Sequence, residues 1–337
     1  MAENETFVIN AAILHVFDFS SGITVYSNRT LNLEDKLIEK YIKGHVRKAM
    51  RDMRMKDGTF LEESLFLEEM RAFQSGSVSF LDTAREISER IEEPLKKDSL
   101  QSYDILEVSY QMEEVPYFGL FLLENTKAFT HATSVDMSGI SVNQITLQAS
   151  ILPSPSKRLN RFAIIQLLSM DVMFVEEEKE EGMRLLQDTI LQCTSTRSKE
   201  EILQEVTDVV TEVAEKCDEN PTLLLSEYKN YLKQNAEESD TITTQDLAVH
   251  VFAKTPKMQD TFLSASLEHE IPQEVRVPQA AVRTAMKNQK IKTDTGIELI
   301  FPTEYFQNPE LIEFINHPDG TISIEIKKVG KITNRGK

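Results

Sequence analysis

Positive charge gathers in one early segment, "KLIEKYIKGHVRKAMRDMRMK", which runs from Lys36 to Lys56. The 337-residue chain as a whole is acidic, with a formal net charge of −18. Within the segment only Glu39 and Asp52 are acidic, whereas the basic residues are Lys36, Lys40, Lys43, Arg47, Lys48, Arg51, Arg54 and Lys56. Clustered cations bind phosphates, so the segment indicates a surface for a polyanion. The alternative is a face that docks on the acidic parts of the protein itself.

The spacing of these cations predicts a charged face on a helix. Six of them recur at intervals of three or four residues, namely Lys36, Lys40, Lys43, Arg47, Arg51 and Arg54. Apolar residues with the same period predict an amphipathic helix packed on a core, and Asn32 is expected to cap it. Like charges at these spacings repel by about 0.2–0.5 kcal/mol per pair, so we expect a negative partner nearby.

A second charged face of comparable length lies later in the chain and is acidic. Its members are Glu201, Glu205, Asp208, Glu212, Glu215 and Glu219. Three interpretations stay open. The two faces could meet within a subunit or across a dimer, each could be solvated, or the basic one could contact nucleic acid while the acidic one faces water. From the residues alone, a protein–protein or solvated role ranks above DNA contact, because charge runs are more often solvated faces than sites.

A further basic group, Lys157, Arg158 and Arg161, follows two prolines, Pro153 and Pro155. It is expected at the start of a helix formed by "SKRLNRFAIIQLLSM". The free N–H groups of a helix N-terminus and nearby cations form a plausible anion site. The alternative is that Ser156 caps the helix and the cations are ordinary surface residues. The nucleic-acid-binding candidates are therefore Lys36, Lys40, Lys43, Arg47, Lys48, Arg51, Arg54, Lys157, Arg158 and Arg161.

No catalytic or cofactor motif stands out. The chain lacks a G-x-G-x-x-G, a phosphate-binding Gly-Lys loop, an H-E-x-x-H and a G-x-S-x-G. The histidines are scattered, and the two cysteines, Cys193 and Cys217, lie far apart. We therefore expect no enzyme, no metal and no cofactor. Catalytic groups that converge from distant positions, such as carboxylates holding a divalent metal, stay open as a third hypothesis.

The pattern of elements predicts an α+β protein with two domains. In 1–155 we expect a mixed sheet with flanking helices, and in 156–337 a mainly helical domain that ends in a β hairpin. The boundary is placed at the prolines of "LPSPSK". No apolar run is long enough for a membrane helix and the N-terminus does not resemble a secretory signal, so a cytoplasmic location without membrane contact is expected.

The layout of the chain resembles the bacterial nucleoid-associated protein family of the NdpA type. The resemblance covers nearly the full length and is carried by "INAAILHVF", "SKRLNRFAIIQLLSM" and "GIELIFPTEYFQNPELIEFINHPDGTISIEIKKVG". It implies association with the nucleoid and a role in DNA binding or chromosome organisation. Of the ten candidates, Lys157, Arg158 and Arg161 match a basic pattern of the family. The acidic net charge departs from the usual basic DNA binder.

Together these observations predict a cytoplasmic, nucleoid-associated, non-enzymatic homodimer. It is expected to bind DNA non-specifically and with moderate affinity, through phosphates rather than base edges. The alternative is a protein-interaction module, a dimeric adaptor whose nucleoid association is indirect.

Overall fold

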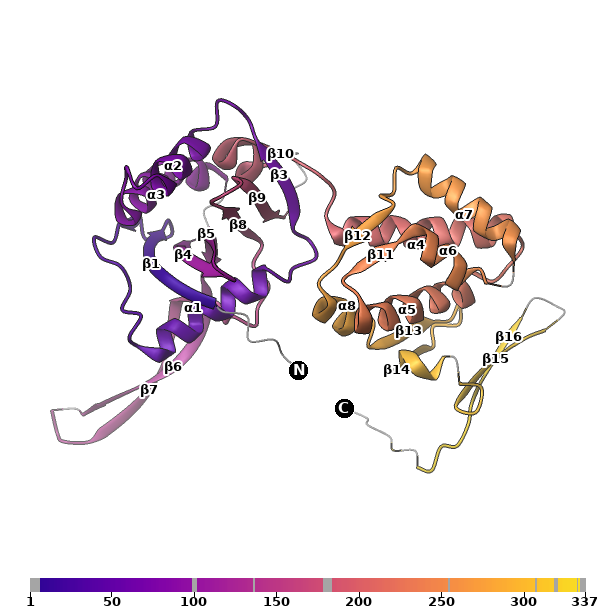
Figure 1. Cartoon of the computed structure of the whole chain (residues 1–337). Coiled ribbons are helices and arrows are strands. Elements are labelled where there is room, and N and C mark those ends of the chain that lie inside the picture. The colour runs from indigo at the N-terminus through magenta and orange to yellow at the C-terminus, as the bar shows by residue number, and fades with distance from the viewer. Residues whose placement is uncertain are drawn as a thin grey trace. The chain divides into compact units, whose positions relative to one another are not determined.

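The computed structural model describes residues 7–98, 102–135, 137–177, 184–253, 255–306, 308–317, 321–331 and 333. The chain divides into two compact units, Met1–Ser198 and Lys199–Lys337 (Figure 1). This division lies beyond the expected boundary at Pro153 and Pro155. The reason is that β8 (Arg161–Gln166) and β9 (Asp171–Glu176) pair with strands of the first unit.

An eight-stranded sheet forms the centre of the first unit. Its order is β10 (Cys193–Ser195), β3 (Lys56–Phe60), β9, β8, β5 (Val115–Glu124), β4 (Tyr103–Met112), β1 (Phe7–Asp18) and β2 (Ile23–Val25). Every ladder within it is antiparallel, so the α+β class is confirmed whereas the expected mixed sheet is not. A hairpin turn at Glu113 and Glu114 joins β4 to β5, and both residues take a positive φ there.

The segment around Arg161 is a strand, and the prediction of a helix there was wrong. Four apolar residues in a row, from Phe162 to Ile165, are buried in β8. A short apolar run has no period that separates a buried strand from a buried helix. Its position between β5 and β9 decides the matter, because both neighbours supply backbone hydrogen-bond partners.

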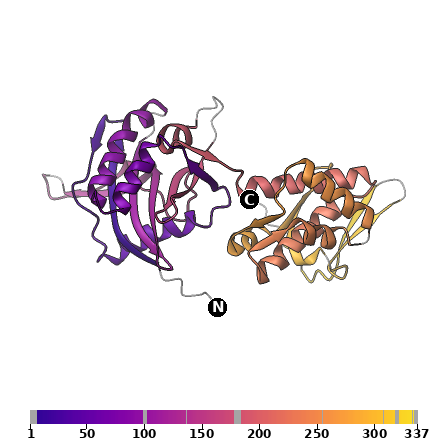
Figure 2. The same ribbon diagram turned by 45° about the horizontal axis from the view of Figure 1, so that its top comes forward.

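Helices cover both faces of this sheet, as Figures 1 and 2 show. The helices α2 (Leu65–Gln74), α3 (Phe80–Asp98) and η1 (Leu185–Leu191) pack on one face, and α1 (Lys36–Ala49) packs on the other. Successive residues of β4 point to opposite faces, so Ile105 joins the first core and Leu106 the second. Eight consecutive residues of β4 are buried for this reason.

The cationic helix α1 is shorter than its sequence period suggests. Its N-cap is Asp35, whose carboxylate accepts a hydrogen bond from the Leu37 N–H at 2.8 Å, and not the expected Asn32. It ends at Ala49, so Arg51 and Arg54 lie beyond it in a turn. Ile42 and Val46 are fully buried, and each contributes about 1.5–3 kcal/mol of apolar burial. That anchoring leaves the opposite face of α1 to solvent.

A second sheet of the first unit consists of a single hairpin, β6 (Thr126–Val135) with β7 (Ser141–Ile151). We call this hairpin the arm. It stands away from the eight-stranded sheet in Figure 1, and nearly all of its described residues are exposed.

The second unit is helical only in part. Its helices are α4 (Lys199–Lys216), α5 (Pro221–Glu238), α6 (Thr244–Val251), α7 (Pro256–Glu268) and α8 (Gln279–Ala285). It also contains a 3-10 turn, η2 (Thr303–Tyr305), and three antiparallel pairs: β11 (Thr241–Thr243) with β12 (Glu274–Arg276), β13 (Asn288–Lys292) with β14 (Glu298–Pro302), and β15 (Ile312–Asn316) with β16 (Ile322–Ile326). Across the described ranges of both units, no helix is long and apolar enough to span a membrane.

Candidate nucleic-acid interface

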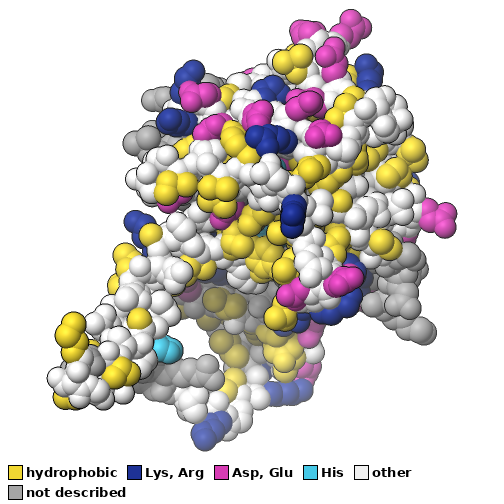
Figure 3. Space-filling model, turned by 90° about the vertical axis from the view of Figure 1, so that its left-hand side faces the viewer, with side chains coloured by type: hydrophobic (Ala, Val, Ile, Leu, Met, Phe, Trp, Pro, Cys, Tyr) yellow, Lys and Arg dark blue, Asp and Glu magenta, His cyan; other side chains and the backbone are white. Residues whose placement is uncertain are grey.

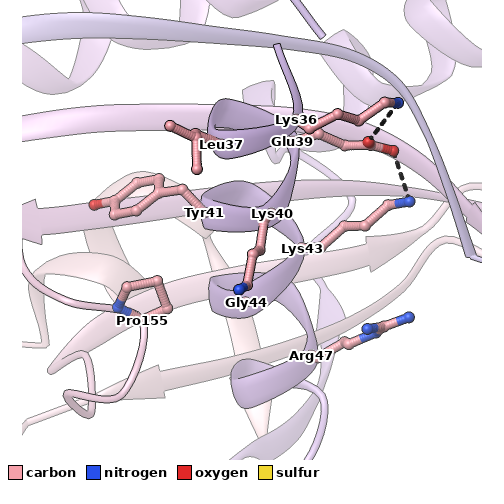
Figure 4. A pocket seen from close by; sticks show the side chains of 9 residues that line it. All are labelled: Lys36, Leu37, Glu39, Lys40, Tyr41, Lys43, Gly44, Arg47 and Pro155. Carbon is pink, nitrogen blue, oxygen red and sulfur yellow. Dashed lines mark hydrogen bonds and ion pairs between the residues drawn. The ribbon is translucent and has the colours of Figure 1, made fainter. Parts of the chain in front are cut away.

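The solvent face of α1 carries most of the predicted cations. Lys36, Lys40, Arg47 and Lys48 are exposed on the helix, and Arg51 is exposed just beyond it. In Figure 4, Lys36, Lys43 and Arg47 extend to one side of α1, away from Tyr41 and Pro155. The predicted spacing therefore produces a continuous row of positive groups along the helix.

Glu39 lies within this row and pairs with two of the lysines. The Lys43 ammonium is 2.7 Å and the Lys36 ammonium 3.0 Å from its carboxylate oxygens (Figure 4). Hydrogen bonds from Lys43 and then from Lys36 hold the pKa of Glu39 below its usual range. Lys43 is only 25% exposed, whereas Lys36 is 81% exposed and can also reach an external anion.

The aromatic ring of Phe7 contacts two cations in the middle of this row. The Lys43 Nζ and Arg47 Cζ atoms lie 5.8 Å and 5.5 Å from the centroid of the Phe7 ring. Such cation–π contacts are worth about 0.5–1 kcal/mol at accessible sites. Phe7 begins β1, so the end of this strand restrains two of the cations.

The loop that follows the arm packs across α1. The Tyr41 hydroxyl donates to the Pro153 carbonyl oxygen at 3.0 Å, and the Lys48 ammonium donates to the Ser156 carbonyl oxygen at 3.3 Å. The next two residues, Lys157 and Arg158, are exposed. The structure thus joins two basic groups that are more than a hundred residues apart in the chain.

Arg54 serves mainly to hold this loop in place. Its guanidinium donates to both carboxylate oxygens of Asp52, at 3.0 and 2.7 Å, and to the Leu159 carbonyl oxygen at 2.8 Å. Burial opposes ionisation of Asp52, but the Arg54 hydrogen bonds outweigh it and, with the nearby charge of Arg158, keep the pKa of Asp52 below its usual range. Arg54 is 26% exposed, so little of it faces an external ligand.

Arg161 lies inside the protein and not on this surface. Its side chain is 4% exposed, with Nη1 2.7 Å from the Asp98 carboxylate and Nε 3.9 Å from the Glu176 carboxylate. The expected helix N-terminus is absent there, because the residue begins β8. An arginine with two buried carboxylate neighbours supports the fold and has no free donor face for a phosphate.

Seven exposed cations remain, and we call them the basic surface: Lys36, Lys40, Arg47, Lys48, Arg51, Lys157 and Arg158. A shallow hollow of about 530 Å³ opens beside it, lined by α1 from Lys36 to Arg47 and by Pro155 (Figure 4). Lysine and arginine only donate hydrogen bonds, so the arrangement suits acceptor-rich anions such as phosphates.

The acidic face predicted on the second charged helix belongs to α4. Its residues Asp208, Glu215 and Glu219 are exposed, with Glu219 just beyond the helix end. Glu212 pairs with Lys216 and lies 3.4 Å from His269. The opposite side of α4 is apolar, and its Val209 and Val213 are fully buried.

Ionisable groups in the described part of the interior do not form a cluster that could hold a metal ion. No group of three or more histidine, cysteine or carboxylate side chains could hold a metal ion among the residues that the structure describes. His15 and Glu107 are both fully buried, 3.3 Å apart, between β1 and β4. His45 is also buried, under the ring of Tyr41.

The residues that position Lys157 and Arg158 beside α1 were not predicted from the sequence. Pro153 and Pro155 were interpreted as a domain boundary, although they carry the loop that contacts α1. Gly44 was the available signal of a close contact, because glycine is unfavourable inside a helix relative to alanine. A Cβ atom at Gly44 would lie 2.7 Å from the Pro155 Cβ, so only glycine allows the loop to approach.

The chain matches a known protein family. A family model described as nucleoid-associated protein YejK matches residues 13–333, which is nearly the whole chain. None of the curated proteins matches the chain.

Proposed function

The chain belongs to the nucleoid-associated protein YejK family, and on that premise we propose that it binds DNA through the phosphate contacts of its basic surface. In this proposal it is a non-enzymatic homodimer that acts on the nucleoid in the cytoplasm. Binding is non-specific in sequence and of moderate affinity.

The observation that supports this proposal most directly is the junction of the loop with α1. Lys48 and Ser156 connect two cationic segments into one surface, and a surface of this kind can follow a phosphate backbone. The close contact of Gly44 with Pro155 brings Lys157 and Arg158 to the cations of the helix.

The acidic net charge is compatible with a local DNA site. At physiological salt, charges separated by more than about 8 Å of solvent are largely screened from each other. A cationic surface can therefore attract phosphates while distant carboxylates repel them weakly. The affinity for DNA is moderate because only the basic surface attracts phosphates and the rest of the protein surface does not.

The test is a salt series with the full-length chain and duplexes of unrelated sequence, followed by fluorescence anisotropy. If each member of the basic surface neutralises one phosphate, the slope of log K against log salt is about −6 per chain. The variant Lys40→Glu/Arg47→Glu/Arg51→Glu is expected to lose most of the affinity.

A matched control is available on the other side of the sheet. The variant Arg71→Glu/Lys96→Glu/Lys97→Glu makes the same charge change at exposed positions of α2 and α3. It is expected to bind nearly as well as the native protein. Equal loss in both variants, or a flat salt response, would count against the basic surface as the site.

One feature supports the protein-interaction alternative. Leu37 is 78% exposed among the cations, and the hollow beside it is partly apolar, a combination that suits an acidic surface with apolar residues in it. Within this chain the acidic face of α4, presented by a second copy, is the candidate. Under this alternative, Asp208→Asn/Glu215→Gln/Glu219→Gln would weaken self-association measured by sedimentation and leave DNA affinity unchanged. Under the DNA proposal, self-association persists and DNA affinity rises slightly, because three repelling charges are gone.

A further inference from the structure

The arm has very little packing against the rest of the first unit. Its strands pair with each other from Thr126 and Ile151 at the base to Val135 and Ser141 near the tip. An isolated two-stranded hairpin is at best marginally stable in water. Residues 127–135 and 141–150 are all exposed, so nothing in the described part of the first unit covers either side. A hairpin of this length needs a partner surface.

One side of the arm carries most of its large apolar residues, together with His131, Thr133, Asn143 and Ser141. Residues that are directly opposite in a ladder share a face, and here Phe129 pairs with Leu147 and His131 with Ile145. Phe129 is 75%, Ile145 82% and Leu147 56% exposed, and Val135 continues the same face at 66%. In Figure 3 the projecting arm shows yellow and white side chains with few charged ones.

The other side of the arm is mainly polar or small, and Val142, which pairs with Ser134, is its larger apolar residue. This side also pairs Thr130 with Thr146 and Ala132 with Gln144. The hairpin is therefore amphipathic, with one face that favours burial and one that tolerates water. Alternation of this kind is typical of a strand pair that covers a second surface with one face only.

The arm carries too few cations to bind a polyanion such as DNA. Between 126 and 151 the only formally charged residues are Lys127 and Asp136. A nucleic-acid contact needs cations, and free strand edges are usually protected by charged side chains. Two copies of a chain with net charge −18 repel each other least where the surfaces in contact carry no charge. A two-fold contact also places identical residues near each other, which an uncharged face permits.

We infer that the apolar face of the arm, formed by Phe129, Val135, Ile145 and Leu147, docks on the same face of a second copy of this chain. The inference names the interface of the homodimer and rests on that part of the proposed function. Leu152 joins β7 to the loop that is seated on α1, so contact between two arms links two basic surfaces. A dimer then makes about twice as many phosphate contacts as a single chain.

The experiment compares two arm variants of the full-length chain by sedimentation velocity over a range of micromolar concentrations. Ile145→Glu/Leu147→Glu places two charges on the apolar face. Thr130→Glu/Gln144→Glu places two charges on the polar face of the same hairpin and serves as the control. The native chain and the control are expected to sediment as dimers and the apolar-face variant as a monomer. Thermal melts check that the body of each variant is folded.

The possible failures are distinguishable. If the native chain is a dimer and Ile145→Glu/Leu147→Glu remains one, the interface lies elsewhere and only this inference is overturned. If both variants dissociate equally, the apolar face is not the cause and the inference is again overturned. If the native chain is a monomer, both this inference and the proposed homodimer are overturned. The salt response of DNA binding still tests the basic surface in that case.

Discussion

Gly44 and Pro155 are in such close contact that a Cβ atom on Gly44 would lie 2.7 Å from the Cβ and 3.2 Å from the Cγ of the proline. The contact seats the loop on the middle of α1. Two hydrogen bonds, from Tyr41 and Lys48, fix the loop on either side of it. The position of Lys157 and Arg158 thus depends on a residue that carries no charge.

Gly44→Ala is expected to destabilise the protein. Alanine normally stabilises a helix by about 1 kcal/mol relative to glycine, but overpacking here costs about 1–3 kcal/mol. Urea unfolding should therefore show a net loss of about 1 kcal/mol, and DNA affinity should fall as the loop is displaced. Pro155→Gly combined with Gly44→Ala should recover part of the loss, because the clashing side chain is removed. An increase in stability from Gly44→Ala alone would contradict the contact.

Single neutralisations should show that the helix and the loop form one surface. Lys40→Gln, Arg51→Gln and Lys157→Gln are each expected to reduce the magnitude of the salt slope by about 0.9 per chain, with additive effects in combination. Anisotropy titrations at several salt concentrations measure the slope. No change for Lys157→Gln would remove the loop from the surface while leaving the helix in place.

Arg161 is expected to affect stability and not DNA binding. Arg161→Gln leaves the buried carboxylates of Asp98 and Glu176 without their cation, at a cost of about 3–5 kcal/mol in the free energy of unfolding. Arg161→Lys keeps the charge and should cost less. The salt slope of whichever variant is folded should equal that of the native chain. A slope reduced as in Arg51→Gln would show instead that Arg161 reaches DNA.

The buried pair of His15 and Glu107 should make stability depend on pH. The Ser27 N–H donates to His15 Nδ1 at 3.0 Å, which leaves Nε2 facing Glu107. Burial, with the nearby charge of Arg85, lowers the pKa of His15 to about 4, and burial raises that of Glu107 well above its usual range. The two shifts act on stability in opposite directions, so each must be isolated.

A Glu107→Gln background isolates the histidine. Between pH 4 and 6.5 the unfolded chain binds a proton at residue 15 that the folded chain does not, so stability rises with pH across this window. The rise is at most about 3 kcal/mol, from 1.36 kcal/mol per pKa unit. Urea unfolding of Glu107→Gln and His15→Gln/Glu107→Gln over this window measures the difference. Parallel pH profiles for the two variants would contradict the lowered pKa.

Local patterns predicted several elements correctly. Strands that pair with their sequence neighbours, such as β4 with β5, depend on the turn between them, which is a local feature of the sequence. The amphipathic period of α1 predicted its buried face from Ile42 to Ala49. The end of α1 was not predicted, since the cations continue the helical spacing to Arg54 after the backbone has turned.

The sequence by itself determined the composition of the charged segments, their spacing and the family resemblance. Only the tertiary structure decided which cations face solvent. Arg158 and Arg161 are three residues apart, yet one is exposed and the other is 4% exposed, because β8 enters the sheet between β5 and β9 at Arg161. Burial at that point depends on strands distant in the chain, and no local period encodes such a contact.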